Sequence, residues 1–273
     1  MKARALLRIW IALCAGPALL AGRAAAESLA VPVDYEGRQI ELAANFERPE
    51  AGGPFPAVIL LHGCGGNDAY ARRRSEYWGE LLRQQGYATL ILDSFRARGY
   101  SNICNNGKLV PTVERAKDVY AAAYVLAARA DVKGDRIAAI GFSHGGGTVL
   151  SAAADWEELI PWEQRLATRG KLVALVGFYP GCRDTLQREF RLPVLVLTGA
   201  SDDWSLARYC QAHAARIPAT APPFRLQVYP GAYHDFDVDG PEHYVVGHKL
   251  AYDAAATADA RVELVSFLGQ YLN

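Results

Sequence analysis

Short apolar runs bounded by turn residues alternate with longer stretches of helical spacing along most of this chain. The apolar runs predict strands at Ala57 to His62, Tyr87 to Asp93, Arg136 to Gly141, Leu172 to Tyr179, Pro193 to Gly199 and Phe224 to Pro230. The helical stretches lie at about Tyr70 to Gln85, Thr112 to Ala130, Gly145 to Asp155, Leu206 to Arg216 and Asp253 to Leu272. This alternation is typical of a parallel sheet whose strands are joined by crossover helices, so it predicts an α/β fold with helices on both faces.

Two further segments complete the expected arrangement. An antiparallel strand pair is predicted within Leu29 to Phe46, ahead of the parallel set. Asp155 to Gly170 does not fit the alternation, and we expect it to form a small insertion over the carboxyl edge of the sheet, where ligands bind in open α/β folds. No linker or internal repeat divides the chain, so residues 27–273 are predicted to form one domain.

The composition is that of an ordinary globular protein. The chain has 273 residues, of which 51% are hydrophobic and 21% charged, with 29 basic against 29 acidic side chains. Disorder requires fewer apolar residues or a larger net charge. A net charge of zero also removes the usual electrostatic argument for a nucleic-acid or membrane-surface partner.

The first 26 residues have the pattern of a secretory signal peptide. Lys2, Arg4 and Arg8 precede an apolar run over residues 9–21, and small residues follow at 24–26. A membrane anchor is the alternative, but the run falls short of the ~20 residues that span a bilayer. We therefore expect export to the periplasm or medium, with Cys14 removed in the signal and no membrane attachment afterwards.

Four cysteines remain after this cleavage, and an even number in an exported chain predicts two disulfides. The count alone allows three pairings. Cys64 and Cys104 follow neighbouring predicted strands, and Cys182 and Cys210 follow another two, so we expect Cys64–Cys104 and Cys182–Cys210. A metal site is the alternative, but no Cys-x-x-Cys or paired-histidine spacing occurs, and no metal is predicted.

The strongest local signal is Gly141-Phe142-Ser143-His144-Gly145, which lies between a predicted strand and a predicted helix. This context is that of a nucleophile elbow, in which a strained turn exposes the central hydroxyl at a helix N-terminus. Residues without side chains are needed on either side of that turn. Ser143 is therefore the predicted nucleophile.

A serine hydroxyl needs a histidine to accept its proton and an acid to orient that histidine. His234 follows a predicted strand at the carboxyl edge, whereas His213 lies within a predicted helix; His243 and His248 are interpreted as surface or packing residues. Asp202 and Asp203 follow the predicted strand Pro193 to Gly199, which precedes the strand before His234. Asp202 is the first choice for the acid, and Asp203 stays open as the alternative.

The developing oxyanion needs preorganised N–H donors. The glycine-rich loop His62-Gly63-Cys64-Gly65-Gly66 follows the first parallel strand, so we nominate the backbone amides of Cys64 and His144. The loop lacks the ending of a phosphate-binding P-loop and the spacing of a dinucleotide fingerprint. No cofactor is predicted.

In combination, several segments resemble the dienelactone hydrolase family: Leu61-His62-Gly63-Cys64-Gly65-Gly66, Asp93-Ser94-Phe95, Phe178-Tyr179-Pro180-Gly181 and Gly231-Ala232-Tyr233-His234-Asp235-Phe236. The likeness runs from about Pro56 to the C-terminus. It implies an α/β-hydrolase fold that acts on esters or lactones without a cofactor.

The sequence also departs from that family's pattern. Members that open dienelactone resemble one another in a cysteine nucleophile, an acid at about the position of Gly63, and an arginine pair for the substrate carboxylate. Here the nucleophile position holds Ser143, and Arg96 or Arg98 matches the first arginine without a second. We therefore expect ordinary serine hydrolysis rather than action on dienelactone.

The leading hypothesis is an exported serine hydrolase whose partner is a small-molecule ester or lactone. Tyr179, Trp204 and Phe236, together with Arg96, are the predicted substrate-binding residues, and core packing is the alternative for the three aromatic residues. A peptidase or polymer deacylase of the same fold is the second enzyme hypothesis. A catalytically silent binding protein of hydrolase fold is the alternative from a different class. The oligomeric state is not predicted.

Overall fold

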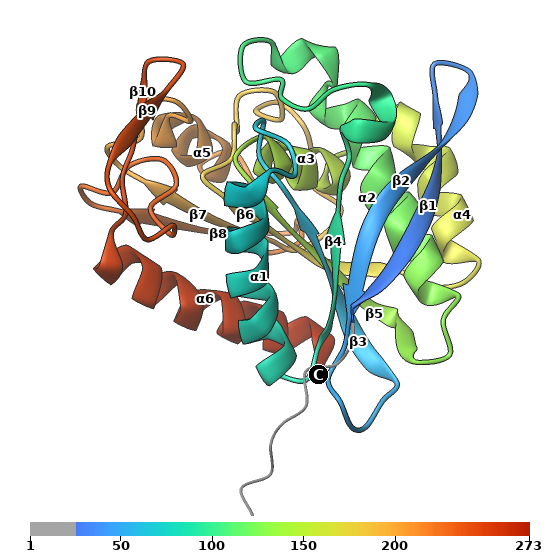
Figure 1. The fold of residues 1–273 in the computed structure, drawn as a ribbon. Helices are drawn as coiled ribbons and strands as arrows, with labels where there is room; N and C mark the ends of the chain where they lie inside the picture. The colour runs from blue at the N-terminus through green and yellow to red at the C-terminus, as the bar shows by residue number, and fades with distance from the viewer. Residues whose placement is uncertain (1–25) are drawn as a thin grey trace, which may run out of the picture.

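The computed structural model describes residues 26–273 and contains an eight-stranded sheet with helices on both faces (Figure 1). The predicted signal peptide, with Cys14, lies outside the described residues except for Ala26. The strand order is β1-β2-β4-β3-β5-β6-β7-β8. These strands are β1 Glu27–Tyr35, β2 Arg38–Glu47, β3 Phe55–Leu61, β4 Ala88–Leu92, β5 Val132–Phe142, β6 Leu172–Phe178, β7 Val194–Gly199 and β8 Phe224–Tyr229. The predicted α/β class is confirmed.

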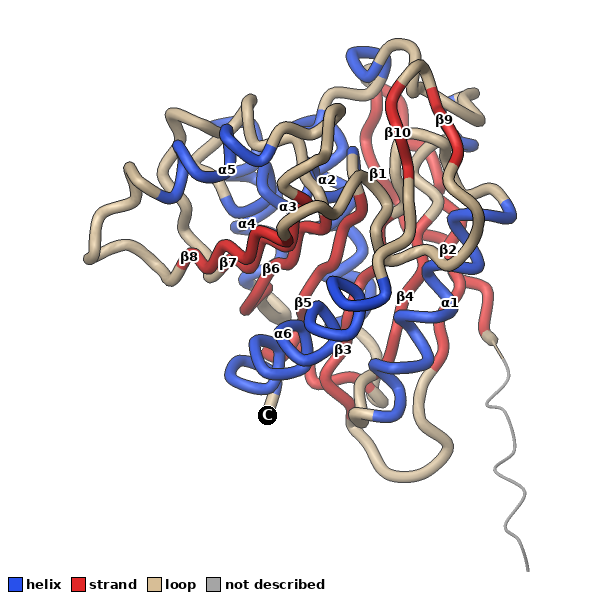
Figure 2. The backbone as a smooth tube through the Cα atoms, turned by 90° about the vertical axis from the view of Figure 1, so that its left-hand side faces the viewer, coloured by secondary structure: helices blue, strands red, loops and turns tan. Residues whose placement is uncertain are grey.

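Two helical layers cover the sheet (Figure 2). The helices are α1 Ala69–Gln84, α2 Thr112–Ala127, α3 His144–Ala153, α4 Ile160–Ala167, α5 Ala207–Ala214 and α6 Ala254–Leu272. Residues of α2, α3, α4 and α5 pack into one core cluster, and those of α1 and α6 pack into the other. Three short 3-10 helices, η1 Arg96–Arg98, η2 Gly107–Leu109 and η3 Glu157–Leu159, lie in the connections.

The central strands β3 and β4, and the second half of β5, are almost continuously apolar and buried on both faces. In β3, Ile59 and Leu61 face the first cluster, whereas Val58 and Leu60 face the second. The antiparallel pair β1–β2 forms an edge of the sheet and alternates buried with exposed residues. This difference explains why the sequence shows continuous apolar runs in one region and alternation in the other.

Strands β3 to β8 run parallel to one another, so their carboxyl ends meet at one edge of the sheet. The loop after β3, the start of α3 after β5, and the loops after β7 and β8 all lie at this edge. A short hairpin of β9 His243–Val245 and β10 His248–Leu250 follows β8. The fold thereby brings segments from between residues 62 and 250 together at the carboxyl edge of the sheet.

The expected insertion over this edge is wrong. Residues 155–170 contain η3 and the helix α4, which packs against α2. At the end of the segment, Lys171 N donates to Gly134 O at 2.9 Å, close to the amino-terminal start of β5. The sequence reading failed because α4 is short, at eight residues, and begins with a proline in its first turn.

Candidate active site

Ser143 occupies a sharp turn between β5 and α3, with a φ of 53° and a ψ of −115°. A side chain at Gly141 would collide with the carbonyl oxygen of Gly145. A Cβ at Gly145 would lie 2.5 Å from the carbonyl oxygen of Leu61 in β3. Both glycines are therefore required by the close approach of backbone, as the elbow pattern predicted.

His234 follows β8 and is 1% exposed. The hydroxyl of Ser143 donates to Nε2 of His234 at 2.8 Å. The backbone of His234 is held by the hairpin, since its carbonyl accepts from the N–H of Ala251 at 3.2 Å and it bridges to Leu250. The imidazole is thus fixed next to the elbow.

Asp202, in the loop after β7, lies on the other side of the imidazole. Its Oδ2 accepts from Nδ1–H of His234 at 2.8 Å, and its Oδ1 accepts from the backbone N–H groups of Trp204 and Ser205. Asp203 is instead directed to His248, with 3.4 Å between Oδ1 and Nδ1. Of the two acids that the sequence left open, the structure brings Asp202 to His234.

The environment of His234 favours its protonated form. Burial opposes a charge on the imidazole, but the hydrogen bond and negative charge of Asp202, with a smaller contribution from Asp235, leave the pKa of His234 raised above 6.5. A neighbouring carboxylate has this effect because it stabilises the imidazolium. The arrangement can therefore hold a proton that leaves Ser143.

The loop after β3 lies directly against the elbow. A Cβ at Gly63 would be 3.4 Å from Cβ of Ser143. Within residues 26–273, the backbone N–H groups of Cys64 and His144 have no hydrogen-bond acceptor. Two unsatisfied donors beside a serine hydroxyl are what an oxyanion hole requires.

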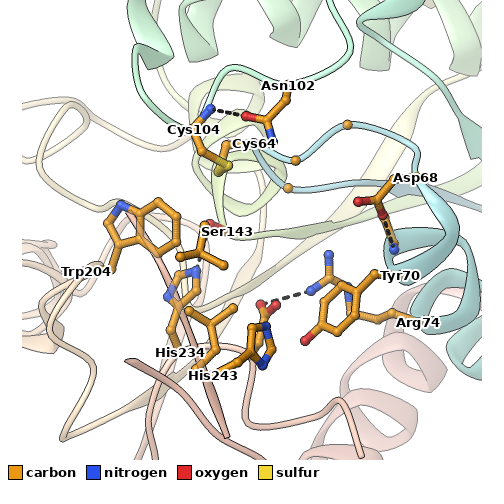
Figure 3. A pocket seen from close by; sticks show the side chains of 17 residues that line it. Cys64, Asp68, Tyr70, Arg74, Asn102, Cys104, Ser143, Trp204, His234 and His243 are labelled. Atoms are coloured by element: carbon orange, nitrogen blue, oxygen red, sulfur yellow. Dashed lines mark hydrogen bonds and ion pairs between the residues drawn. A yellow bond between two sulfur atoms is a disulfide. The ribbon is translucent and has the colours of Figure 1, made fainter. Parts of the chain in front are cut away.

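A cavity of about 290 Å³ opens in front of Ser143 and His234 (Figure 3). Trp204 forms one wall, with its ring centroid 5.1 Å from that of His234, as the sequence predicted for a substrate-facing residue. Arg74 and Tyr70 of α1 lie on another side of the cavity (Figure 3). The hairpin contributes His243, Val245 and Leu250 to its lining.

The other three predicted substrate-binding residues lie elsewhere. Tyr179 and Phe236 are fully buried in the core cluster beneath the site, and neither lines the cavity. Arg96 points into solvent, with 76% of its side chain exposed, and pairs with Asp93 at 3.6 Å. The sequence could not separate a buried aromatic residue from a cavity wall because both follow strands at the same edge.

Arg74 is a cavity residue that the sequence analysis missed. Its Nη1 donates to Oδ1 of Asp235 at 2.9 Å and to the hydroxyl of Tyr179 at 3.0 Å. The Tyr179 hydroxyl in turn donates to Asp237 at 2.7 Å. Helical spacing was the available signal, since Arg74 shares the buried stripe of α1 with Ala71 and Trp78.

The four cysteines form the two expected disulfides. Cys64–Cys104 joins the loop after β3 to the loop after β4 and lines the cavity, whereas Cys182–Cys210 joins the segment after β6 to α5. No cluster of three or more potential metal-ligating residues occurs in the described chain. Across the same residues, no helix is long and apolar enough to cross a membrane.

The sequence and fold of this chain are similar to those of several known proteins. A protein from a Bradyrhizobium species, named as a probable 2-oxo-3-(5-oxofuran-2-ylidene)propanoate lactonase, is 26% identical over 207 residues, covering 71% of this chain and 78% of that protein. A dienelactone hydrolase from Anabaena variabilis has a TM-score of 0.64 at 19% identity, covering 91% of this chain and 99% of that one. Esterase 2 of Thermogutta terrifontis, phosphorylated by paraoxon, has a TM-score of 0.64 at 17% identity over 90% of this chain and 94% of its own.

The two structural likenesses establish the α/β-hydrolase fold, and the family follows from the sequence. The model of the dienelactone hydrolase family matches residues 42–272, which is most of the chain. With the fold, the elbow and this match together, the chain belongs to the dienelactone hydrolase family.

Proposed function

We propose that this protein is a serine hydrolase that cleaves small carboxylic esters or lactones through an acyl-enzyme. The observation that carries the proposal is the continuous hydrogen-bonded series from the Ser143 hydroxyl through His234 to Asp202. Each link is 2.8 Å, and Asp202 and His234 are both buried. This geometry matches the roles of nucleophile, base and orienting acid.

In the first step, the Ser143 oxygen attacks the carbonyl carbon while Nε2 of His234 accepts the hydroxyl proton. The negative charge on the carbonyl oxygen is stabilised by the N–H groups of Cys64 and His144. The carbon–oxygen bond to the alcohol then breaks, and the imidazolium returns the proton to the leaving oxygen. Water repeats the sequence on the acyl-enzyme and releases the acid, or the opened hydroxy acid of a lactone.

Asp202 holds the imidazole tautomer through these steps and stabilises the imidazolium, without itself taking the proton. No cofactor or metal enters this scheme. The size of the cavity supports a small substrate, because about 290 Å³ is slightly below the roughly 300–1,000 Å³ usual for ligand sites. A small cavity favours this proposal over a peptidase or polymer deacylase, which must accommodate a chain.

We further propose that residues 1–26 are removed on export and that residues 27–273 act as one domain. Two disulfides support an oxidising compartment, since such bonds are rare in reducing cytosol. Mass determination of protein recovered from the periplasm or medium tests this assignment directly.

The test of the chemistry is Ser143→Ala, assayed on p-nitrophenyl esters of graded chain length. We expect loss of at least about 1,000-fold in turnover with an unchanged fold, because the side chain supplies the attacking oxygen. Ser28→Ala, an exposed serine of β1, is the matched control and should behave as wild type. More than about a tenth of wild-type turnover in purified Ser143→Ala would remove Ser143 from the mechanism.

A fluorophosphonate probe separates the hydrolase from a silent binding protein. The wild type should be labelled on Ser143, and the Ser143→Ala variant should not. A folded wild type that resists labelling and cleaves no ester would favour the binding protein. Faster cleavage of peptide amides than of esters would favour the peptidase.

A further inference from the structure

A buried arginine lies behind the elbow. Arg115, near the start of α2, is 0% exposed. Its Nη1 donates to Nδ1 of His144 at 3.1 Å, and its guanidinium carbon lies 4.7 Å from the centre of the Phe95 ring. Its Nε and Nη2 have no hydrogen-bond partner within residues 26–273.

Within residues 26–273, no carboxylate forms an ion pair or hydrogen bond with Arg115, although the charges of Asp118 and Asp93 partly offset the effect of its burial. Asp118, one turn further along α2, is bound by both terminal nitrogens of Arg98, at 2.9 and 2.7 Å. Burial lowers the pKa of Arg115 to about 9, so the group is still charged near neutral pH. Burying a charge in this way costs several kcal/mol, and such costs are retained chiefly where function needs them.

Among the described residues, the side chain to which Arg115 donates is that of His144, the residue that follows Ser143. Because a guanidinium can only donate, Nδ1 of His144 must accept, and the ring proton must lie on Nε2. Burial and the charge of Arg115 lower the pKa of His144 to about 3, which keeps the ring neutral. Arg115 therefore holds the Nδ1 side of the His144 ring and sets its tautomer, while the backbone of Gly107 and Val110 also contacts the ring.

The Phe95 ring lies between the Arg115–His144 pair and the loop that carries Cys64, the other proposed oxyanion donor. Its ring centre lies 4.6 Å from that of His62 and 5.9 Å from that of His144. His62 precedes the Gly63-Cys64 peptide, and Cys64 itself packs against the cluster that contains Phe95. The segments that carry the two amides therefore meet at one ring, with Arg115 over it.

A hydrogen bond also fixes the Cys64 loop. Nδ1–H of His62 donates to the carbonyl of Gly63 at 2.8 Å, while its Nε2 accepts from the N–H of Ser94 at 3.2 Å. The loop is thus bound to the strand end next to Phe95. The turn that carries the other amide, that of His144, is held by the hydrogen bond between Arg115 and His144.

We propose that Arg115 is a positioning residue for the oxyanion hole, which acts through the His144 side chain to hold the His144 N–H aimed at the developing oxyanion. This inference rests on the proposed function. A misdirected amide weakens binding of the transition state more than binding of the substrate, so the effect belongs in kcat.

The experiment compares Arg115→Met with wild type on a p-nitrophenyl ester. We expect kcat to fall about 10- to 100-fold while KM changes less than about threefold, since one donor is misdirected rather than removed. A trifluoromethyl ketone, which forms an oxyanion adduct with the serine, should lose affinity by a similar factor. Arg165→Met is the matched control: Arg165 also lies over an aromatic ring, at 4.5 Å from that of Tyr124, and its removal should leave kcat unchanged.

His144→Ala tests the route of the effect, because it keeps the backbone N–H and removes the side chain that Arg115 holds. Its kcat should fall by about as much as that of Arg115→Met. The kcat of the double variant should be less than about twofold below that of either single variant. Independent, multiplying losses would overturn the proposal. So would a folded Arg115→Met or His144→Ala with kcat within twofold of wild type.

Folding and function are checked separately. If Arg115→Met does not fold, His144→Ala alone decides, and wild-type kcat in that variant refutes the inference. An active wild type with unimpaired His144→Ala refutes this inference alone. A wild type that cleaves no ester refutes the proposed function and the inference together.

Discussion

Two buried arginines contact the segments that carry Ser143 and His234, and the two arginines have different partners. Arg74 lies next to the His234 loop and is bound by Asp235 and Tyr179. Burial opposes its charge, but Tyr179, Asp235 and Asp237 outweigh that effect and raise the pKa of Arg74. For Arg115, by contrast, burial dominates, and the pKa is lowered to about 9.

The difference indicates two kinds of support. On the His234 side, carboxylates compensate the buried cation, and the network controls the charge of the imidazole. On the elbow side, the cation has a neutral imidazole as its hydrogen-bonded partner, and its contribution is the direction of a backbone amide. Changes to the carboxylates around Arg74 should therefore alter stability and the protonation of His234, whereas Arg115→Met should lower kcat without altering the protonation of His234.

The largest effect that sharpens this comparison is expected at the acid of the His234 side. Asp202→Asn should lower kcat about 10³- to 10⁴-fold, because the amide no longer fixes the tautomer that accepts the Ser143 proton. Asp203→Asn should cost little, since Asp203 pairs with His248 at the surface. Steady-state kinetics of both variants checks this, and the reverse order would move the acid to Asp203.

The next effect concerns stability. Asp235→Ala removes the carboxylate that pairs with Arg74 at 2.9 Å and should cost about 3–5 kcal/mol of unfolding free energy, because the buried cation loses its direct ion pair and retains the neutral hydroxyl of Tyr179. The double variant Arg74→Met, Asp235→Ala should lose less free energy of unfolding than the sum of the losses in the two single variants. Urea denaturation measures all three.

A surface pair provides the control for that measurement. Asp135 is 65% exposed and pairs with Arg136 at 2.9 Å, so Asp135→Ala should cost about 1 kcal/mol or less. A loss of similar size for Asp235→Ala would contradict the view that carboxylates compensate Arg74.

The smallest effect is on the pH dependence. His234 accepts a proton only when neutral, so its raised pKa predicts that kcat/KM falls as the pH drops through a midpoint above 6.5. The groups that act on its charge are Asp202, Asp235 and Arg74. Asp235→Asn should lower the midpoint, because a negative charge that favours the imidazolium is lost.

Arg115→Met should leave that midpoint in place while lowering kcat. The measurement is the dependence of kcat/KM on pH between about pH 5 and 9 for wild type, Asp235→Asn and Arg115→Met. A midpoint that moves with Arg115→Met and not with Asp235→Asn would invert the comparison between the two arginines.

The sequence by itself determined the features that depend on neighbouring residues. Apolar runs and helical spacing gave the order of strands and helices because burial on a sheet or helix has a fixed period. The elbow at Ser143 was predictable because its glycine pattern is local: Gly141 is needed by the nearby backbone of Gly145, although the need for glycine at 145 comes from β3. His234 could be preferred over His213 because its loop follows a strand.

Tertiary structure decided which side chains of these segments face the cavity. Tyr179 and Phe236 follow the right strands but point into the core, while Arg74 enters the site from a helix distant in sequence. Asp202 and Asp203 differ by one position, and only the packing of the loop against His234 distinguishes them. Local sequence fixes where a chain turns, but contacts among residues far apart fix where each side chain points, because those contacts form only when all layers pack together.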